Sequence, residues 1–376
     1  MKDIRFGIIG LGLMGREFAS LAARWFHLEN MDVRPVITAI CDTNEAAFDW
    51  FARNLPSVKL QTTDYRELLG SGEVDAVYCA VPHNLHQQLY SDIIRAGKHL
   101  LGEKPFGMDK AANDAINGVI AEHPEVLVRC SSEFPFYPGA FEIVQNLRED
   151  SFGRIIDIEA GFLHSSDLNP DKPINWKRMI DVNGEYGCMG DLGMHVLHIP
   201  LRFGLTPRKV RAQLTNIITE RPDASGKHIP CETWDNATLL TEVEKDAYTF
   251  PMTLHTKRIA PGEANTWFLN VHGTEKSMMY STKYPKTLRV LEYTPGGPQA
   301  WQHLDTPYQS AYPAITGSIF EFGFSDALLQ MFAAFCDELG NGKDGMSQPF
   351  TCVTPQEAAE SHRVFTAALE AQEGSR

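Results

Sequence analysis

Lys104, Asp191 and His195 are the residues whose types and spacing best suit a reaction with proton transfer. Asp191 and His195 are four residues apart, and on a helix this spacing places both side chains on one face. A histidine titrates near neutral pH, so it can take a proton from an alcohol and later return it. A lysine ammonium can stabilise negative charge on the reacting oxygen. We predict His195 as general base, Lys104 as its electrostatic partner and Asp191 as an orienting group or substrate ligand.

The same residues also allow simpler structural explanations. Taken alone, Lys104 fits a solvated surface lysine, Asp191 a helix cap and His195 a buried core histidine. A metal site is a further alternative, because Asp191, His195 and His198 could place three zinc ligands on one helical face. No cysteine partner and no His-Glu-x-x-His motif accompanies them, so we predict no metal.

A glycine motif lies between a strand-like run at residues 4–9 and a helical stretch, and it reads Gly10-Leu11-Gly12-Leu13-Met14-Gly15. Gly10 permits a tight turn, Gly12 lets the backbone approach a pyrophosphate, and Gly15 lets the helix pack close to the strand. The N-terminus of the helix supplies free N–H groups and the positive end of its dipole. In this context the motif predicts a dinucleotide site at residue 10 and residues 12–15.

Asp42 follows the second strand-like run and is a candidate for the adenosine ribose. A carboxylate there accepts hydrogen bonds from both ribose hydroxyls and repels the 2′-phosphate of NADP. The next residues are Thr43 and Asn44, with no arginine to hold such a phosphate. These residues favour NAD over NADP, although an aspartate that caps the next helix remains an alternative.

The pattern of apolar residues predicts the order of the strands and helices that position these residues. Short apolar runs alternate with amphipathic helical stretches through the first third of the chain, which is typical of a doubly wound parallel sheet. The predicted strands are at 4–9, 36–41, 74–81, 99–102 and 126–130, and the predicted helices at 16–26, 45–55, 85–96 and 110–122. We therefore predict an α/β, NAD-binding Rossmann domain over residues 1–134.

Beyond this region, strand-like runs follow one another with few helices between them. They predict an α+β domain over residues 135–376, with a large open and mostly antiparallel sheet. The strand-like runs are at 155–162, 237–243, 250–255 and 267–272, and two helical stretches at 326–339 and 355–371 close the chain. Four residues near strand ends are weaker candidates for a hydroxyl-rich pocket: His164, His255, Lys257 and Tyr280.

Composition excludes several classes of function. The chain has 376 residues and a formal net charge of −14, which disfavours nucleic acid as the partner because phosphates require a surplus of cations. No apolar run reaches the length of a membrane span, and the N-terminus does not resemble a signal peptide. The seven cysteines are scattered without a Cys-x-x-Cys pair, which is typical of reduced thiols. We expect a cytoplasmic protein with no membrane partner.

Three motifs in order resemble the Gfo/Idh/MocA family of glucose–fructose oxidoreductase and inositol dehydrogenase. They are the glycine motif, the segment Glu103-Lys104-Pro105 and the Asp191-x-x-x-His195 pair. The resemblance implies that Lys104 touches both substrate and nicotinamide ribose, and that Asp191 and His195 form the catalytic pair. It also implies further cofactor contacts at Glu103, at Pro82, Asn84 and His86 of the segment after the strand-like run at 74–81, and at Trp176.

The resemblance implies an NAD-dependent oxidoreductase that moves a hydride between nicotinamide and a sugar, cyclitol or sugar derivative. Its relatives usually form dimers or tetramers, so we expect a homodimer or homotetramer. Glu185 and Tyr186 depart from the family, which commonly has a glycine triplet before the aspartate. Two other functions remain as alternatives to the dehydrogenase. One is a redox-assisted glycosidase with Tyr186 as a second base, and the other is a non-catalytic sensor of NAD and a sugar.

Overall fold

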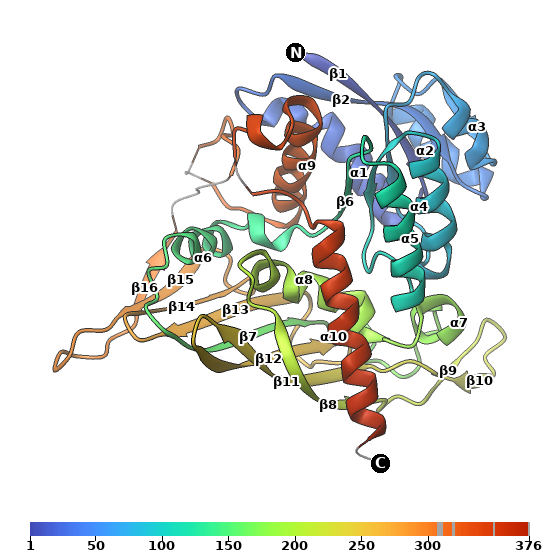
Figure 1. Ribbon diagram of the computed structural model, residues 1–376. Helices are drawn as coiled ribbons and strands as arrows, with labels where there is room; N and C mark the ends of the chain where they lie inside the picture. Colours follow the sequence, from blue (N-terminus) through green and yellow to red (C-terminus); the bar gives the residue numbers. More distant parts are fainter. Residues whose placement is uncertain (307–310, 318–319, 349, 375–376) are drawn as a thin grey trace.

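The computed structural model describes residues 1–306, 311–317, 320–348 and 350–374. The chain forms two large β-sheets, the first toward the top of Figure 1 and the second toward the bottom. Helices surround the first sheet and lie between it and the second. In these described ranges, no helix is both long and apolar enough to cross a lipid bilayer.

The first sheet has six parallel strands in the order β3-β2-β1-β4-β5-β6. The winding changes direction between β1 and β4, and ligands of doubly wound sheets bind beyond the carboxyl ends of the strands at such a point. The strands are β1 (Lys2–Ile9), β2 (Val33–Cys41), β3 (Leu60–Thr62), β4 (Ala76–Cys79), β5 (His99–Gly102) and β6 (Val128–Cys130).

Helices cover both faces of this sheet, and each face has its own apolar core. Phe6 of β1 packs with α1 and with Phe332 of α9 on one face, where the two rings are 5.2 Å apart. Ile9 of β1 joins Ile93 of α4 and Ile116 of α5 on the other face. The helices are α1 (Leu13–Ala23), α2 (Phe48–Asn54), α3 (Tyr65–Gly70), α4 (His86–Arg95), α5 (Lys110–Glu122) and α9 (Phe324–Asn341).

The second sheet has eight strands in the order β16-β15-β14-β13-β7-β12-β11-β8. Its pairs are antiparallel except for β7 with β12, which run parallel. The strands are β7 (Ile155–Leu163), β8 (Pro207–Thr215), β11 (Asn236–Lys245), β12 (Tyr248–Lys257), β13 (Thr266–Gly273), β14 (Lys276–Ser281), β15 (Thr287–Glu292) and β16 (Gln302–Asp305). A separate two-stranded ribbon joins β9 (Glu220–Pro222) and β10 (His228–Pro230).

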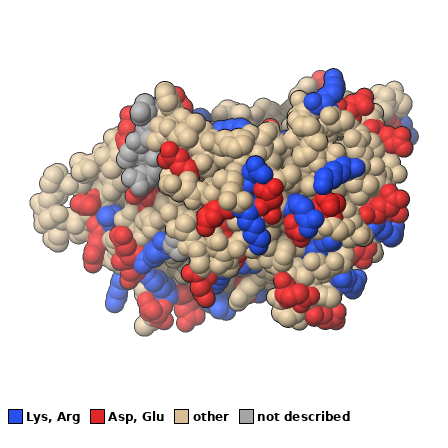
Figure 2. All heavy atoms as spheres, turned by 90° about the horizontal axis from the view of Figure 1, so that it is seen from above, with Lys and Arg blue, Asp and Glu red and all other residues tan. Residues whose placement is uncertain are grey.

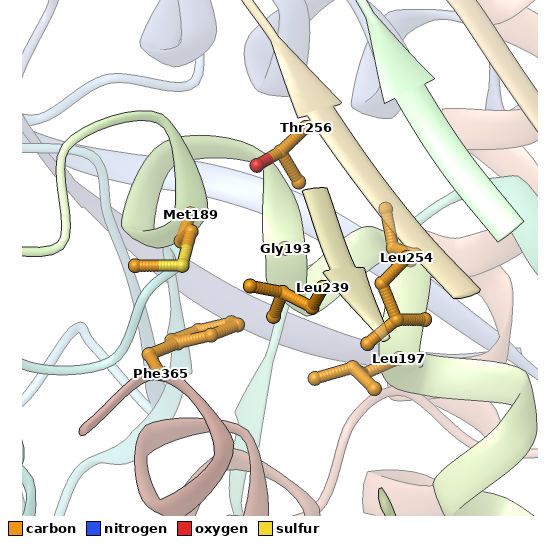
Figure 3. A pocket seen from close by; sticks show the side chains of 8 residues that line it. Met189, Gly193, Leu197, Leu239, Leu254, Thr256 and Phe365 are labelled. Carbon is orange, nitrogen blue, oxygen red and sulfur yellow. The ribbon is translucent and has the colours of Figure 1, made fainter. Parts of the chain in front are cut away.

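The helix α8 packs on the covered face of the second sheet and carries Asp191 and His195. Figure 3 shows the apolar seam where Met189, Gly193 and Leu197 of α8 face the sheet and Phe365 of α10. A Cβ atom on Gly193 would lie 2.5 Å from the ring of Phe365, so only glycine allows this close approach. The remaining α-helices are α6 (Pro138–Arg148), α7 (Ile180–Asn183), α8 (Cys188–Arg202) and α10 (Pro355–Glu373).

Two helices of the C-terminal part tie the sheets together. Although α9 comes late in the sequence, it packs against α1, β1 and β2 of the first sheet. The long helix α10 runs down the molecule in Figure 1 and contacts α5, β6, α8 and β8. The division into residues 1–134 and 135–376 therefore stays a proposal about folding units, with one helix of the second unit covering the first sheet.

The predicted fold class is confirmed: a Rossmann-type parallel sheet is followed by an α+β region with a mostly antiparallel sheet. Each predicted strand and helix overlaps an observed one. The short edge strand β3 and the helix α3 were not predicted. Single-turn 3-10 helices complete the chain: η1 (Trp25–His27), η2 (Glu45–Ala47), η3 (His83–Leu85), η4 (Phe134–Phe136), η5 (Trp176–Arg178) and η6 (Lys343–Gly345).

Candidate active site

A cleft of about 940 Å³ lies between the two sheets and receives residues from both. Gly10, Gly12 and Asp42 line one end, and Lys104, Asp191 and His195 line the other. This volume lies at the upper end of the range for small-molecule sites, roughly 300–1,000 Å³, so it can hold a large cofactor together with a substrate. The cleft thus joins the predicted nucleotide turn to the predicted catalytic residues.

The glycine turn has the geometry that a bound pyrophosphate requires. Gly10 has φ +92°, and a Cβ atom there would lie 2.3 Å from the carbonyl oxygen of Ala80. A Cβ atom on Gly15 would lie 2.2 Å from the carbonyl oxygen of Gly10, whereas Gly12 faces open space. Gly12 is also the N-cap of α1, and no side chain or acidic residue occupies this helix end. Its free N–H groups and dipole are therefore available to an anion.

Leu13, Met14 and Asp42 complete this end of the cleft. One carboxylate oxygen of Asp42 accepts a hydrogen bond from the Leu11 backbone N–H at 2.8 Å, and the other accepts from Asn44 at 2.9 Å. Asp42 therefore fixes the glycine turn, and each of its oxygens keeps a lone pair for a ribose hydroxyl. These residues fit the adenosine half of NAD.

The segment after β4 is only partly directed into the cleft. Pro82 and His83 line it, whereas Asn84 is exposed outside it. His86 is fully buried, with its ring nitrogens 3.1 Å from the Val81 carbonyl oxygen and 3.3 Å from the Gly107 N–H. The structure does not bring Asn84 and His86 into the cleft, because α4 begins here and turns their side chains away.

Glu103 and Lys104 follow β5 and have different surroundings. One oxygen of Glu103 accepts hydrogen bonds from Tyr78 at 2.7 Å and Ser131 at 2.6 Å, which ties the ends of three neighbouring strands together. Lys104 extends into the cleft and donates to Oδ1 of Asp191 at 2.6 Å. Glu103 thus supports the floor of the cleft, and Lys104 offers its charge to a ligand.

Asp191 lies in the first turn of α8, buried among three cations. Besides Lys104, it accepts hydrogen bonds from Lys177 at 2.9 and 3.0 Å and from Arg258. Burial alone would raise the pKa of Asp191, but the three positive charges outweigh this effect and hold the pKa well below its usual value. Asp191 therefore orients the cations, and it does not hydrogen-bond to His195 as one of its two predicted roles required.

His195 lies one turn after Asp191 and is 5% exposed. Its Nδ1 is 3.1 Å from the Ser132 hydroxyl and 3.8 Å from Oε2 of Glu133. Phe134 and Phe162 contact the ring edge-on. Burial, followed by the charge of Lys104, lowers the pKa of His195 well below its ordinary value, so the ring is neutral at neutral pH. The neutral ring is the form that accepts a proton.

Glu133 is a buried carboxyl group that also lines the cleft. Burial, supported by the charge of Glu103, raises its pKa to about 8. The sequence analysis missed Glu133 and Ser132, as well as Arg258 and the His83 ring. Their positions after β6, β12 and β4 follow the rule that functional residues gather at strand ends, and this was the signal that could have found them.

Trp176 and Lys177 belong to η5 and line the cleft. The Lys177 ammonium lies 5.5 Å from the centre of the Trp176 ring, and the His83 ring meets Trp176 edge-on at 4.8 Å. Burial, together with the nearby charges of Lys104 and Arg258, lowers the pKa of Lys177 to about 8 against the opposing effect of Asp191. The aromatic ring of Trp176 and the ammonium group of Lys177 thus lie side by side in the wall of the cleft.

Several weaker candidates lie elsewhere. Of the four strand-end residues only His164 lines the cleft. Tyr186 is fully buried, and its hydroxyl pairs with Thr366 at 2.7 Å, so it cannot reach a substrate. Two of the residues named for a zinc site have other partners, since His198 contacts Arg202 at 3.2 Å and Asp191 is held by cations. Across the described parts of the chain, no three His, Cys, Asp or Glu side chains converge on a metal position.

Comparison with known proteins defines the class to which this fold and cleft belong. Residues 4–128 match the family described as "Oxidoreductase family, NAD-binding Rossmann fold", and residues 142–279 match the GFO/IDH/MocA C-terminal domain. The protein is therefore an oxidoreductase with an NAD-binding Rossmann domain. The chain belongs to the Gfo/Idh/MocA family, as its motifs predicted.

Two curated relatives are similar to this chain in sequence, and one solved structure is similar to it in fold. Levoglucosan dehydrogenase of Pseudarthrobacter phenanthrenivorans is 23% identical over 304 residues, which cover 77% of this chain and 76% of the relative. UDP-N-acetylglucosamine 3-dehydrogenase of Acidithiobacillus ferrooxidans is 29% identical over 229 residues, covering 59% and 62%. A levoglucosan dehydrogenase in complex with NADH and L-sorbose superposes with a TM-score of 0.88 at 20% identity, over 100% of this chain and 98% of that one.

Proposed function

We propose that this protein is an NAD-dependent dehydrogenase that oxidises a hydroxyl-bearing carbon of a sugar, cyclitol or sugar derivative. The observation that carries the proposal is the single cleft in which the glycine turn of one sheet faces Lys104 and His195. An alcohol oxidation requires a hydride acceptor, a base and a positive charge within reach of one carbon. The similarity to two sugar dehydrogenases supports a carbohydrate as substrate.

The cofactor fits along the cleft from Asp42 to Lys104. The pyrophosphate would rest on the N–H groups at the start of α1, and Asp42 would bind the adenosine ribose. Leu13 is 75% exposed at this end and offers an apolar surface to the cofactor. Pro82 and Trp176 would flank the nicotinamide end, where the bound cofactor supplies the carbon that accepts the hydride. Glu103 supports this end from beneath through its contacts with Tyr78 and Ser131.

His195 is the proposed general base. Its Nδ1 is engaged by Ser132, which leaves Nε2 for the substrate hydroxyl. When Nε2 takes the hydroxyl proton, positive charge develops on the ring, and Glu133 lies 3.8 Å behind it to balance that charge when ionised. Ser132 fixes the ring orientation, so the proton is accepted at one defined atom.

Lys104 is the proposed electrostatic partner of the reacting oxygen. Its ammonium has three N–H groups, of which Asp191 accepts one, and the others can hydrogen-bond to the substrate oxygen. As the hydroxyl loses its proton, negative charge develops on that oxygen and Lys104 stabilises it. Asp191 holds the ammonium in place through a 2.6 Å hydrogen bond, so it is a positioning residue in this scheme.

Assembly and location are further parts of the proposal. Leu240 of β11 is 46% exposed and alternates with the buried Leu239 and Thr241, so it lies on the uncovered face of the second sheet, and we propose that a homodimer or homotetramer forms there. All seven cysteines are free and buried, which fits a reducing cytoplasm. Light scattering of the purified protein, with Leu240→Lys as the disrupting variant, tests the assembly.

The function is tested by following reduced nicotinamide formation with NAD and a panel of sugars, cyclitols and glycosides. We expect NADH to accumulate with a carbohydrate, and His195→Asn to lower kcat about 100-fold or more. NADP should support much slower turnover. Turnover that persists at the wild-type rate in a Lys104→Met, His195→Asn double variant would exclude the assigned roles.

A further inference from the structure

The substrate end of the cleft holds an unusual concentration of positive charge. Lys104, Lys177 and Arg258 come from three separate segments and all donate to the one carboxylate of Asp191. Two of these cations, Lys104 and Lys177, share its Oδ1 atom at 2.6 and 2.9 Å. Two ammonium groups are held close together on one oxygen, and the single negative charge of Asp191 leaves this cluster with a net positive charge.

The neighbouring groups do not remove this excess. Arg258 also pairs with Asp167, and Asp167 in turn pairs with Lys172. Four cations therefore face two carboxylates, which leaves two positive charges. Counting Glu103, whose carboxylate is directed at Tyr78 and Ser131, still leaves one.

The nearby titratable side chains do not supply the missing negative charge at neutral pH. Burial raises the pKa of Glu133 to about 8 and keeps it protonated, and burial lowers the pKa of His164 to about 4. Burial also lowers the pKa of His83 and of His195 well below the ordinary value, so both rings are neutral. The excess positive charge is therefore a property of the site without its ligand.

The cluster of positive charge in the cleft contrasts with the negative net charge of the whole protein. The chain carries a formal net charge of −14, and Figure 2 shows basic and acidic side chains interspersed over the face seen from above. The overall field of such a protein repels anions, so a cationic cleft floor must be built locally. Lys177 keeps 28% of its side chain exposed and lines the cleft, which makes its ammonium available to a ligand.

The cofactor does not account for Lys177 and Arg258. Its pyrophosphate is expected at the start of α1, and its adenosine ribose is expected at Asp42. Lys177 belongs instead to η5 and Arg258 follows β12, and both lie in the second region of the chain, as does Asp191 of α8. A neutral sugar needs hydrogen-bond donors but no surplus of charge. An anion would add a counter-charge beside Lys177, whose pKa is lowered by burial and then by the charges of Lys104 and Arg258.

We propose that the substrate is an anionic sugar whose carboxylate or phosphate group is bound by Lys177, with Lys104 and Arg258 adding to the positive field. This inference rests on the proposed dehydrogenase function and narrows its substrate class. Lys104 keeps its part in stabilising the reacting oxygen, and Lys177 determines specificity. The anionic group lies near Trp176, whose ring forms the adjoining wall.

Matched substrates test the proposal. Glucuronate and galacturonate are compared with their neutral methyl esters and with the parent hexoses, and hexose 6-phosphates form a separate arm that distinguishes phosphate from carboxylate. We expect kcat/KM for one anionic sugar to exceed that of its neutral counterpart about tenfold or more, as one charge-assisted hydrogen bond provides. A neutral counterpart that is turned over equally well or better would overturn the proposal.

Variants assign the effect to Lys177. In Lys177→Met the anionic-to-neutral ratio of kcat/KM should fall toward one, and Lys177→Arg should restore most of it. Lys257→Met is the matched control, because it removes a positive charge one residue from Arg258 without lining the cleft, and its ratio should remain that of the wild type. A ratio that is unchanged in Lys177→Met, or that falls equally in Lys257→Met, would contradict the assignment.

Binding separates this inference from the proposed function. The thermal midpoint of the NADH-loaded protein is measured with each uronate, sugar phosphate and neutral counterpart. A rise that is specific to an anion and lost in Lys177→Met, without turnover of any sugar, would support the anion site and refute the dehydrogenase. Turnover of neutral sugars, without preferential binding or turnover of any anion, would support the dehydrogenase and refute the anion site.

Discussion

Glu133 and His195 lie together at the floor of the cleft, with Oε2 of Glu133 3.8 Å from Nδ1 of His195. Burial raises the pKa of Glu133 to about 8, so the carboxyl is protonated at neutral pH and becomes an anion above that value. The anion stabilises the protonated His195 ring that forms when a substrate hydroxyl is deprotonated. We predict that kcat for alcohol oxidation rises with pH through about 8 and that Glu133→Gln abolishes this rise.

The control for this prediction is the stability of the same variant. The pKa of Glu133 in the folded protein lies above the value of about 4.3 for an unfolded glutamate, so its contribution to stability is lost as pH rises toward 8. Glu133→Gln should therefore be no less stable than wild type at pH above about 8. A pH–rate profile with the same limb in the Gln variant would assign the ionisation to another group.

Asp191 and Lys104 should respond differently to mutation. Asp191→Asn leaves three buried or half-buried cations without their shared counter-charge, and the free energy of unfolding should fall by about 3 kcal/mol or more. Lys104→Met leaves Asp191 paired with two cations, so the loss should be smaller, about 1 kcal/mol, while kcat falls about 100-fold or more. Urea denaturation and initial rates measure the two effects. Equal stability losses would contradict the charge distribution described for this cluster.

Asp42 should determine the choice between NAD and NADP. Asp42→Asn keeps an acceptor for the Leu11 N–H but loses the negative charge that repels a 2′-phosphate. We expect the Kd of NADP to decrease about tenfold or more and the Kd of NAD to increase by a similar or smaller factor. Tryptophan fluorescence quenching measures both constants. An unchanged preference for NAD would place the adenosine ribose elsewhere.

Gly193 should be intolerant of a methyl group. Its Cβ would lie 2.5 Å from the Phe365 ring in the seam between α8 and α10, so Gly193→Ala should lower the free energy of unfolding by about 1–3 kcal/mol. Gly118 in α5 is the matched control, because its Cβ would meet nothing within 4 Å. Gly118→Ala should be neutral or stabilising by up to about 1 kcal/mol. Thermal melts with the two variants in the opposite order would contradict the packing.

The first sheet could be predicted because its elements alternate along the chain and its glycines mark the turn after β1. Short pieces such as β3 and α3 escaped, since three to six residues carry too little periodicity. The packing of α9 on the first sheet could not be read from sequence. Phe332 and Phe6 are 326 positions apart, and only the fold brings their rings to 5.2 Å.

The site was predictable where a motif specifies it and unpredictable where long-range contacts complete it. Lys104, Asp191 and His195 line one cleft, but Arg258 reaches Asp191 from 67 residues away and no local pattern indicates it. His86 illustrates the converse error, because residues close together at the start of a helix point in different directions. His83 faces the cleft, whereas His86 turns into the core.

The most direct test of the central claim uses a substrate carrying deuterium at the carbon that is oxidised. If hydride passes in this cleft from that carbon to nicotinamide, the NADH released by the wild-type enzyme will contain one deuterium per turnover, and His195→Asn will slow its appearance. Turnover of the sugar with no deuterium in the free NADH pool would contradict the account and indicate chemistry other than a net dehydrogenation.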